Sequence, residues 1–267
     1  MRAVLGIDAA WTLTQPSGVA VAVERSGGWR LIAAESSYRR FYDRVIEGRP
    51  GEEHPSGSSP DAHDLLASGA ALCGCPIDLV AIDMPLARSP IVNRRTSDDE
   101  VSHTYGGRQC ATHSPNAKRP GRISDDLRVS FEQEGYSLCT DTIATPGVVE
   151  VYPHPALVEL SGASKRLPYK VSKARSYWPM ATPQERRACL YRKWSEIVTL
   201  LEGRISGVAQ ALPPLELNAS SWQTKAYEDK LDAVVCVWVA ICCLNGQAMA
   251  YGDDNSAIWI PRTSVVS

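Results

Sequence analysis

Hydrophobic residues occur along this chain in short apolar or alternating runs that are separated by polar turns. Runs of this length between turn residues are typical of strands. Three of them come within the first 35 residues, with turn sequences at Gln15-Pro16-Ser17-Gly18 and Ser26-Gly27-Gly28. This spacing predicts an antiparallel three-strand meander over residues 3–8, 18–24 and 29–35.

After the meander, helix and strand patterns alternate. Residues 47–60 are rich in Gly, Pro, Ser and charge and predict a loop, and Ser59-Pro60-Asp61 begins a helix that runs to about Leu72. A fourth strand over residues 78–83 is expected to lie parallel to the first through a right-handed crossover. The later patterns predict a strand over 148–152, helices over 122–134, 155–160, 183–202 and 222–244, and a closing hairpin over 248–261.

Residues 86–121 interrupt this alternation. They are polar and show no sustained period, which predicts an irregular insertion near a functional site. The chain contains no internal repeat. We therefore expect one α/β domain over residues 1–267, in which helices flank a mixed sheet made of the antiparallel meander and parallel strands.

Composition narrows the class of protein only slightly. Hydrophobic residues make up 44% and charged residues 22%, with a formal net charge of -2, so no global basic field indicates a nucleic-acid binder. No apolar run reaches the roughly 20 residues that span a bilayer. Asp8 would interrupt the apolar part of a signal peptide, and the eight cysteines, several of them in apolar segments, are typical of reduced core thiols. These features predict a cytoplasmic protein without a membrane segment.

Four acidic residues lie within or at the end of apolar segments, where an unpaired charge is unfavourable. Asp8, Asp83 and Glu150 each end an apolar strand run, and Asp232 lies in an apolar helix that also carries Glu228. Burying a carboxylate is costly unless it is paired or binds a cation. Strands of one sheet bring their ends together, so the acids predict a shared site.

Mg²⁺ and Mn²⁺ prefer oxygen ligands, and two such ions about 3.5–4 Å apart can activate water and stabilise a leaving alkoxide. The expected function is therefore a divalent-metal-dependent nuclease or phosphodiesterase acting on a nucleic acid or nucleotide. Its expected ligands are Asp8, Asp83, Glu150, Asp232 and Glu228.

The order of elements and the acidic positions resemble the RNase H-like fold. More narrowly, the chain resembles the family known as domain of unknown function 429, which is described as a predicted RNase H-like nuclease. The resemblance implies an RNase H-like sheet and, less directly, nuclease activity. It is carried by Gly6-Ile7-Asp8-Ala9-Ala10-Trp11, Ile82-Asp83-Met84-Pro85-Leu86, Glu150-Val151-Tyr152-Pro153-His154-Pro155 and Tyr227-Glu228-Asp229-Lys230-Leu231-Asp232-Ala233.

Several further residues are candidates to assist. His154 follows Glu150 by four residues and could hold a phosphate or move a proton, although it could equally be a turn histidine. Arg122 and Arg128 could contact a substrate phosphate or form a solvated face. Lys170 and Lys173 belong to a basic and aromatic stretch over residues 165–178, which predicts a substrate-binding edge or else a polar surface loop.

Alternatives remain for individual residues. Asp8 and Asp83 could cap turns, and Glu150 could pair with an arginine. His103, Cys110 and His113 could bind zinc but lack a clear fourth ligand, so a role without metal is the stronger interpretation.

Two other function classes also remain. An actin- or sugar-kinase-type phosphotransferase would share the core fold, but Trp11 stands where a phosphate would approach. A non-catalytic nucleic-acid-binding module would fit the modest charge. The sequence predicts no oligomeric state.

Overall fold

The fold is described from a computed structural model, which describes residues 1–48 and 54–262. Within these residues a mixed sheet has the strand order β3-β2-β1-β4-β6-β8-β7, and the short β5 pairs with β6. The first three strands are antiparallel, and β1, β4, β6 and β8 are mutually parallel. The strands are β1 (Ala3–Asp8), β2 (Gly18–Arg25), β3 (Gly28–Glu35), β4 (Leu79–Ile82), β5 (Ser137–Leu138), β6 (Gly147–Val151), β7 (Ala248–Gly252) and β8 (Ala257–Pro261).

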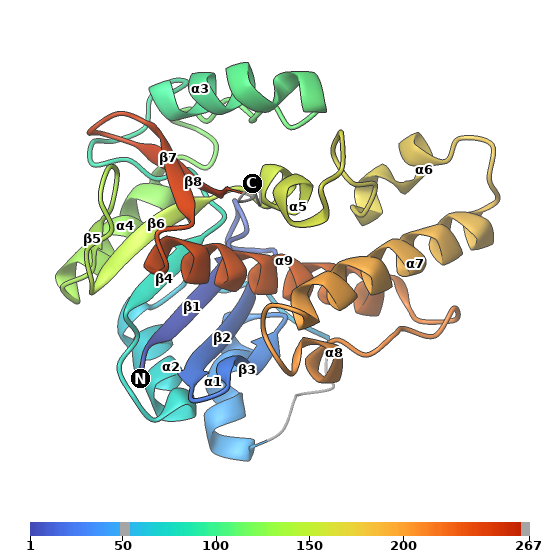
Figure 1. Cartoon of the computed structure of the whole chain (residues 1–267), viewed down its shortest axis with the longest axis horizontal. Helices are drawn as coiled ribbons and strands as arrows, with labels where there is room; N and C mark the ends of the chain where they lie inside the picture. The colour runs from blue at the N-terminus through green and yellow to red at the C-terminus, as the bar shows by residue number, and fades with distance from the viewer. Residues whose placement is uncertain (49–53, 263–267) are drawn as a thin grey trace.

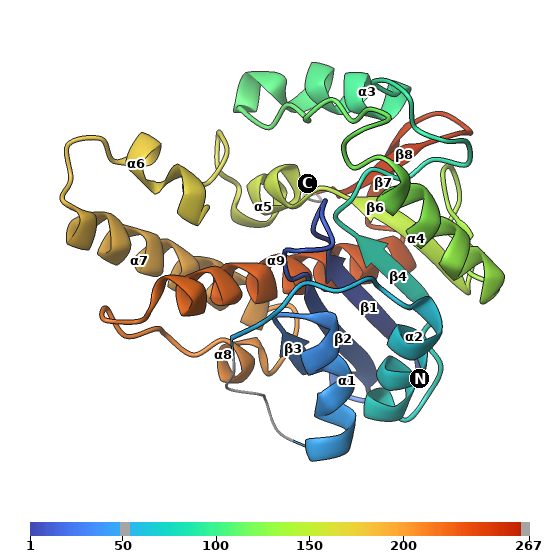
Figure 2. The same ribbon diagram turned by 180° about the vertical axis from the view of Figure 1, so that it is seen from behind.

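Helices cover both faces of the sheet. The long helix α9 crosses one face together with α5, α7 and α8, whereas α1, α2 and α4 lie on the other (Figures 1 and 2). Helix α3 packs on the β7–β8 hairpin. The helices are α1 (Tyr38–Glu47), α2 (Ala62–Cys73), α3 (Thr96–Tyr105), α4 (Arg122–Gln133), α5 (Pro153–Ser161), α6 (Ala174–Tyr177), α7 (Pro183–Glu202), α8 (Val208–Ala211) and α9 (Ser221–Leu244).

Alternation along the central strands produces these two layers. In β4, Leu79 and Ala81 pack into the core under α9, while Val80 and Ile82 pack into the core under α2 and α4. Successive side chains of a strand point to opposite faces, so a continuous apolar run serves both cores. The mixed α/β architecture predicted from the sequence is confirmed.

Two glycines allow α9 to lie directly on the sheet. A Cβ on Gly6 would come 2.3 Å from the carbonyl oxygen of Ala233, and one on Gly18 would come 2.0 Å from that of Asp229. Any side chain there would push the helix away from β1 and β2. This close approach brings the acidic turn of α9 to the end of β1.

The main differences from the sequence predictions lie in helices that carry few apolar residues. Helix α1 was not expected, although the Ser37 side chain caps it and Phe41 anchors it in the core. Residues 86–121 were expected to be irregular, but α3 forms there, with Val101 and Tyr105 on its buried side. Of the predicted 47–60 loop, residues 54–60 form no helix or strand, and residues 49–53 lie outside the described residues.

Two of the composition-based expectations can be compared with the structure. Among the described helices, none has the length and apolarity that crossing a bilayer requires. All eight cysteines carry free thiols, and six of them are buried.

Candidate active site

Three of the predicted acids meet at the carboxyl edge of the parallel strands. Asp8 ends β1, and the amide of Asp83, just after β4, donates to the carbonyl of Ile7 at 2.8 Å. The two aspartates therefore start from neighbouring strands, about 4.8 Å apart. Asp232 reaches the same edge from α9, with its side chain fully buried. In open α/β sheets, ligands bind in the crevice outside this edge.

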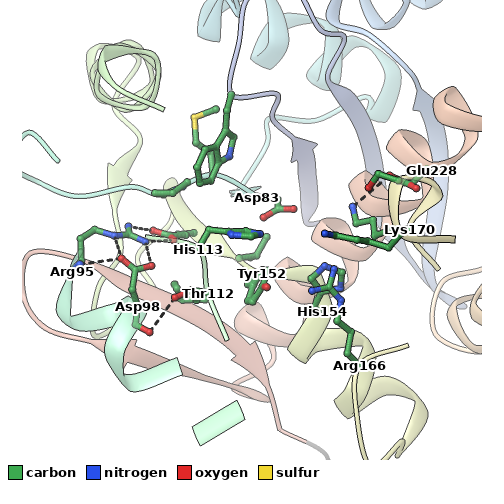
Figure 3. A pocket seen from close by; sticks show the side chains of 18 of the residues that line it. Asp83, Arg95, Asp98, Thr112, His113, Tyr152, His154, Arg166, Lys170 and Glu228 are labelled. Carbon is green, nitrogen blue, oxygen red and sulfur yellow. Dashed lines mark hydrogen bonds and ion pairs between the residues drawn. The ribbon is translucent and has the colours of Figure 1, made fainter. Parts of the chain in front are cut away.

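Two cavities adjoin at these acids. One has a volume of about 320 Å³ and the other about 410 Å³. Trp11, Asp83 and His113 line both cavities, and Asp8 lines the second. Figure 3 shows Asp83 between the Arg95 side of the first cavity and the Lys170 side. The aspartate pair thus faces space that a ligand could enter.

The carboxylates of Asp8 and Asp83 accept no hydrogen bond from any residue that the structure describes. Burial, together with the negative charge of Asp232, raises the pKa of Asp8 well above its usual value, and Lys170 opposes the rise. Burial also raises the pKa of Asp83 to about 7. Both groups would gain from a nearby cation.

Asp232 differs from this pair because its oxygens already have partners. The Tyr169 hydroxyl donates to one oxygen at 2.8 Å, and the Lys170 ammonium forms an ion pair with the other. Burial opposes the charge on Lys170, but Asp232, Tyr169 and Glu228 outweigh it and raise the pKa of the lysine. Lys170 is therefore a resident cation among the carboxylates.

The segment that carries Lys170 is held on both sides. The Trp194 indole nitrogen on α7 donates to the Tyr169 carbonyl at 2.8 Å, and the Val171 amide donates to Glu228 on α9. Lys225 pairs with Glu228 at 3.2 Å. The carboxylate of Glu228 thus anchors the segment, and its oxygens are already engaged.

Glu150 lies on the neighbouring strand in a closed environment. Its oxygens accept from the Arg95 guanidinium at 2.5 and 2.7 Å, and one of them also accepts from the Leu86 amide at 2.7 Å. Arg95 binds Asp98 as well, and all three charged side chains are at least 95% buried. The structure therefore confirms the alternative interpretation of Glu150, in which an arginine pairs with it.

His154 lies below Asp83 in the first cavity, with its ring against Tyr152 and Tyr169 (Figure 3). Burial, reinforced by Lys170, Arg166 and His113, lowers its pKa well below the usual value. Its Nδ1 is buried and has no hydrogen-bond partner in the described residues. The ring is therefore neutral at physiological pH.

The predicted basic residues divide into two groups. Lys170 and Lys173 line the first cavity, together with Arg166. Arg122 is 89% exposed, and Arg128 pairs with Glu132 at 2.6 Å; neither lines the two cavities. Tyr169 is fully buried, so it is not available to stack on a base.

Sequence reasoning missed three partners of the acids. Arg95 carried no signal beyond its place in a polar stretch, and Tyr169 acquires its role only through the fold. Lys225 could have been found, because it precedes Glu228 and Asp229 by three and four residues on one helix face.

The donor set fits a divalent cation only in part. In the described part of the chain, no three His, Cys, Asp or Glu side chains converge closely enough to hold a metal ion. Mg²⁺ commonly uses one or two carboxylates and takes its other ligands from water and substrate phosphate. Asp8 and Asp83 fit that mode, whereas Glu150, Glu228 and Asp232 are engaged with protein cations or amides.

The chain matches the family model described as "Protein of unknown function (DUF429)" over residues 6–256. The chain belongs to this family. The match covers the end of β1 and all of β4, β6 and α9, and so includes every acid discussed above. Searches of curated proteins and of solved structures found no match.

Proposed function

We propose that this member of the family is a cytoplasmic, divalent-metal-dependent phosphodiester hydrolase that acts on a nucleic acid or nucleotide. The observation that carries the proposal is the pair Asp8 and Asp83. These two adjacent, half-buried carboxylates lie where two cavities meet, and no described residue donates a hydrogen bond to them. Keeping such a pair is unfavourable unless a cation joins it.

Asp8 and Asp83 would hold one Mg²⁺ or Mn²⁺ ion. That ion would supply Lewis-acid activation of a phosphate oxygen and of a nucleophilic water. Asp232 does not need to be a ligand in this arrangement, since Lys170 already neutralises it. Lys170 would then limit the charge repulsion that a phosphodiester meets on entering an acidic site.

The cavity wall beside Lys170 supplies the complementary charge. Arg166 and Lys173 line it, and the Nε of Arg166 is buried without a hydrogen-bond partner among the described residues. Cations on one wall and carboxylates on the floor would orient a phosphodiester with its oxygens toward Arg166. Trp11, which lines both cavities, offers a flat apolar surface for a base or sugar.

His154 contributes as a neutral group. Because its pKa is lowered, it would not attract a phosphate as a cation. A neutral imidazole can still accept a proton or a hydrogen bond. Its place beside Tyr152 in the cavity wall favours positioning of the substrate over charge neutralisation.

The test is cleavage of labelled single- and double-stranded DNA and RNA and of bis(p-nitrophenyl) phosphate, with Mg²⁺, Mn²⁺ or EDTA. We expect activity that requires metal and falls about a thousandfold or more in Asp8→Asn. Asp126→Asn makes the same chemical change on an exposed surface, where the side chain is 68% exposed. This control should retain full activity.

Two outcomes would contradict the proposal. Cleavage that survives EDTA or persists in Asp8→Asn would exclude carboxylate-metal chemistry at this site. A folded wild-type protein that cleaves no substrate with either metal would favour a binding module instead.

A further inference from the structure

A second large cavity lies away from the strand ends, beside the edge strand β3. Its volume is about 660 Å³, roughly twice that of the first active-site cavity. Figure 1 shows β3 between α1 and α8, and both helices contact this strand. Cavities of about 300–1,000 Å³ are the usual size for small-molecule sites.

The cavity lies where the segment that pairs with β3 turns away from the strand. The Leu31 amide donates to the Ser206 carbonyl at 2.9 Å, and the Ser206 amide donates to the Trp29 carbonyl at 2.9 Å. Gly207 then turns away with a φ of 89°, which is a left-handed conformation that favours glycine. Residues 31–34 of β3 form one apolar wall, and Ala211 and Pro213 lie among the other lining residues.

Among the described residues, the side chains that line the cavity include no acidic one and four cationic ones: Arg25, Arg30, Arg44 and Lys230. Arg44 pairs with the buried Glu35 at 3.3 Å. The side chains of Arg25, Arg30 and Lys230 have no hydrogen bond or ion pair with any residue that the structure describes. The cavity therefore carries a net positive charge, which Glu35 offsets only in part.

Lys230 is the cation that α9 contributes to the cavity. It lies half-buried on α9, where Glu35 attracts its charge and Arg40 and Arg44 repel it. A partly buried ammonium without an ion-pair partner is costly. An anion in the cavity would offset that cost.

We propose that this cavity binds a small phosphorylated ligand, with its phosphate against Lys230, Arg30 and Arg44 and its apolar body on the β3 wall. Arginine favours bidentate contact with phosphate, and a lysine adds a point charge. The site is separate from the proposed hydrolase site, because a helix turns about 100° per residue and Lys230 therefore faces away from Asp232.

The experiment is calorimetric titration of the full chain with inorganic phosphate and with phenyl phosphate, in EDTA. We expect both to bind, and phenyl phosphate to bind at least about threefold tighter because its ring adds apolar contact. Lys230→Met should weaken both at least about tenfold. Arg30→Gln changes an exposed strand residue, so a folded variant is expected, and it should weaken binding about threefold.

Matched controls locate the bound anion. Lys118→Met removes the same charge from an exposed turn, and Arg192→Gln removes one from the exposed side of α7. Both should bind phenyl phosphate as the wild type does. Absence of millimolar binding, an equal loss in all variants, a selective loss in Lys118→Met, or equal affinity for the two probes would each overturn the proposal. Because the titration contains no metal and no cleavable substrate, its result does not depend on the hydrolase proposal.

Discussion

Asp83 and Glu150 stand at the ends of neighbouring parallel strands, yet their surroundings are opposite. Glu150 is enclosed by Arg95 and the Leu86 amide, so its charge is fully used within the protein. Asp83, with Asp8 beside it, faces a cavity and receives no hydrogen bond from the described residues. An acid after an apolar strand can thus form a structural ion pair, or it can remain available to bind a ligand. The hydrogen-bond and ion-pair partners of the carboxylate determine its role, and the following predictions test that distinction.

The largest effect is expected on the enclosed side. Arg95→Met would leave Glu150 and Asp98 buried without their cation and should lower the free energy of unfolding by about 3–5 kcal/mol. Urea denaturation would measure the loss. Arg122→Met, at a position that is 89% exposed, should stay within about 0.5 kcal/mol of wild type. Similar losses in both variants would show that the Arg95 cluster is not structural.

The next effect concerns the resident cation. Lys170→Met would remove the cation that most strongly offsets the charges of Asp8, Asp83 and Asp232, and should cost about 2–3 kcal/mol in EDTA. Added Mn²⁺ should recover much of that loss and stabilise the variant more than the wild type. Thermal unfolding with EDTA or Mn²⁺ would measure both, with Lys173→Met as the charge-matched control. A variant that Mn²⁺ does not stabilise would argue against metal binding here.

A smaller, pH-dependent effect is expected for Asp83→Asn in EDTA. The folded protein holds the pKa of Asp83 at about 7, against about 3.9 in an unfolded chain. The folded state therefore binds the extra proton between those values, and wild-type stability falls as pH rises through this window. The variant removes the group, so it should be more stable than wild type by at least about 1 kcal/mol at pH 8 and equal to it near pH 4.

Denaturation curves across this pH range would measure the difference, and Asp126→Asn should show no such trend. A gain for Asp83→Asn that is constant with pH would contradict the raised pKa.

The smallest expected effect is a difference in KM between a variant in the cavity wall and one on the outer surface. Lys173→Gln should raise the KM for bis(p-nitrophenyl) phosphate about fivefold, because one cation leaves the wall. Arg122→Gln should change it by less than about twofold. Steady-state kinetics would distinguish them, and a larger effect at Arg122 would place the substrate outside these cavities.

Much of the architecture was predictable because strongly apolar runs determine it. The continuous apolar runs of residues 3–8 and 79–82 and the long apolar helix that ends at Leu244 are visible without coordinates. Helices α1 and α3 were not, since each buries few apolar residues and owes its place to tertiary contacts.

The site was predictable to the level of residue type and strand end. Asp8, Asp83 and Asp232 do meet, because parallel strands and a helix packed on Gly6 and Gly18 bring them together. The pairing of Glu150 with Arg95 joins residues 55 positions apart, and Lys170 reaches Asp232 across 62. Pairings between residues so far apart produce no pattern in a single sequence. They determine which carboxylates are already hydrogen-bonded and which remain available to a ligand.

The most direct test of the central claim is Mn²⁺ binding, measured by titration calorimetry, to Asp83→Asn and Glu150→Gln. Asp83→Asn should weaken Mn²⁺ binding at least about tenfold, because it removes one of two ligands from the open pair. Glu150→Gln, compared where circular dichroism shows it to be folded, should bind Mn²⁺ within about threefold of the wild-type affinity. Loss of Mn²⁺ binding in Glu150→Gln with retention in Asp83→Asn would contradict the account.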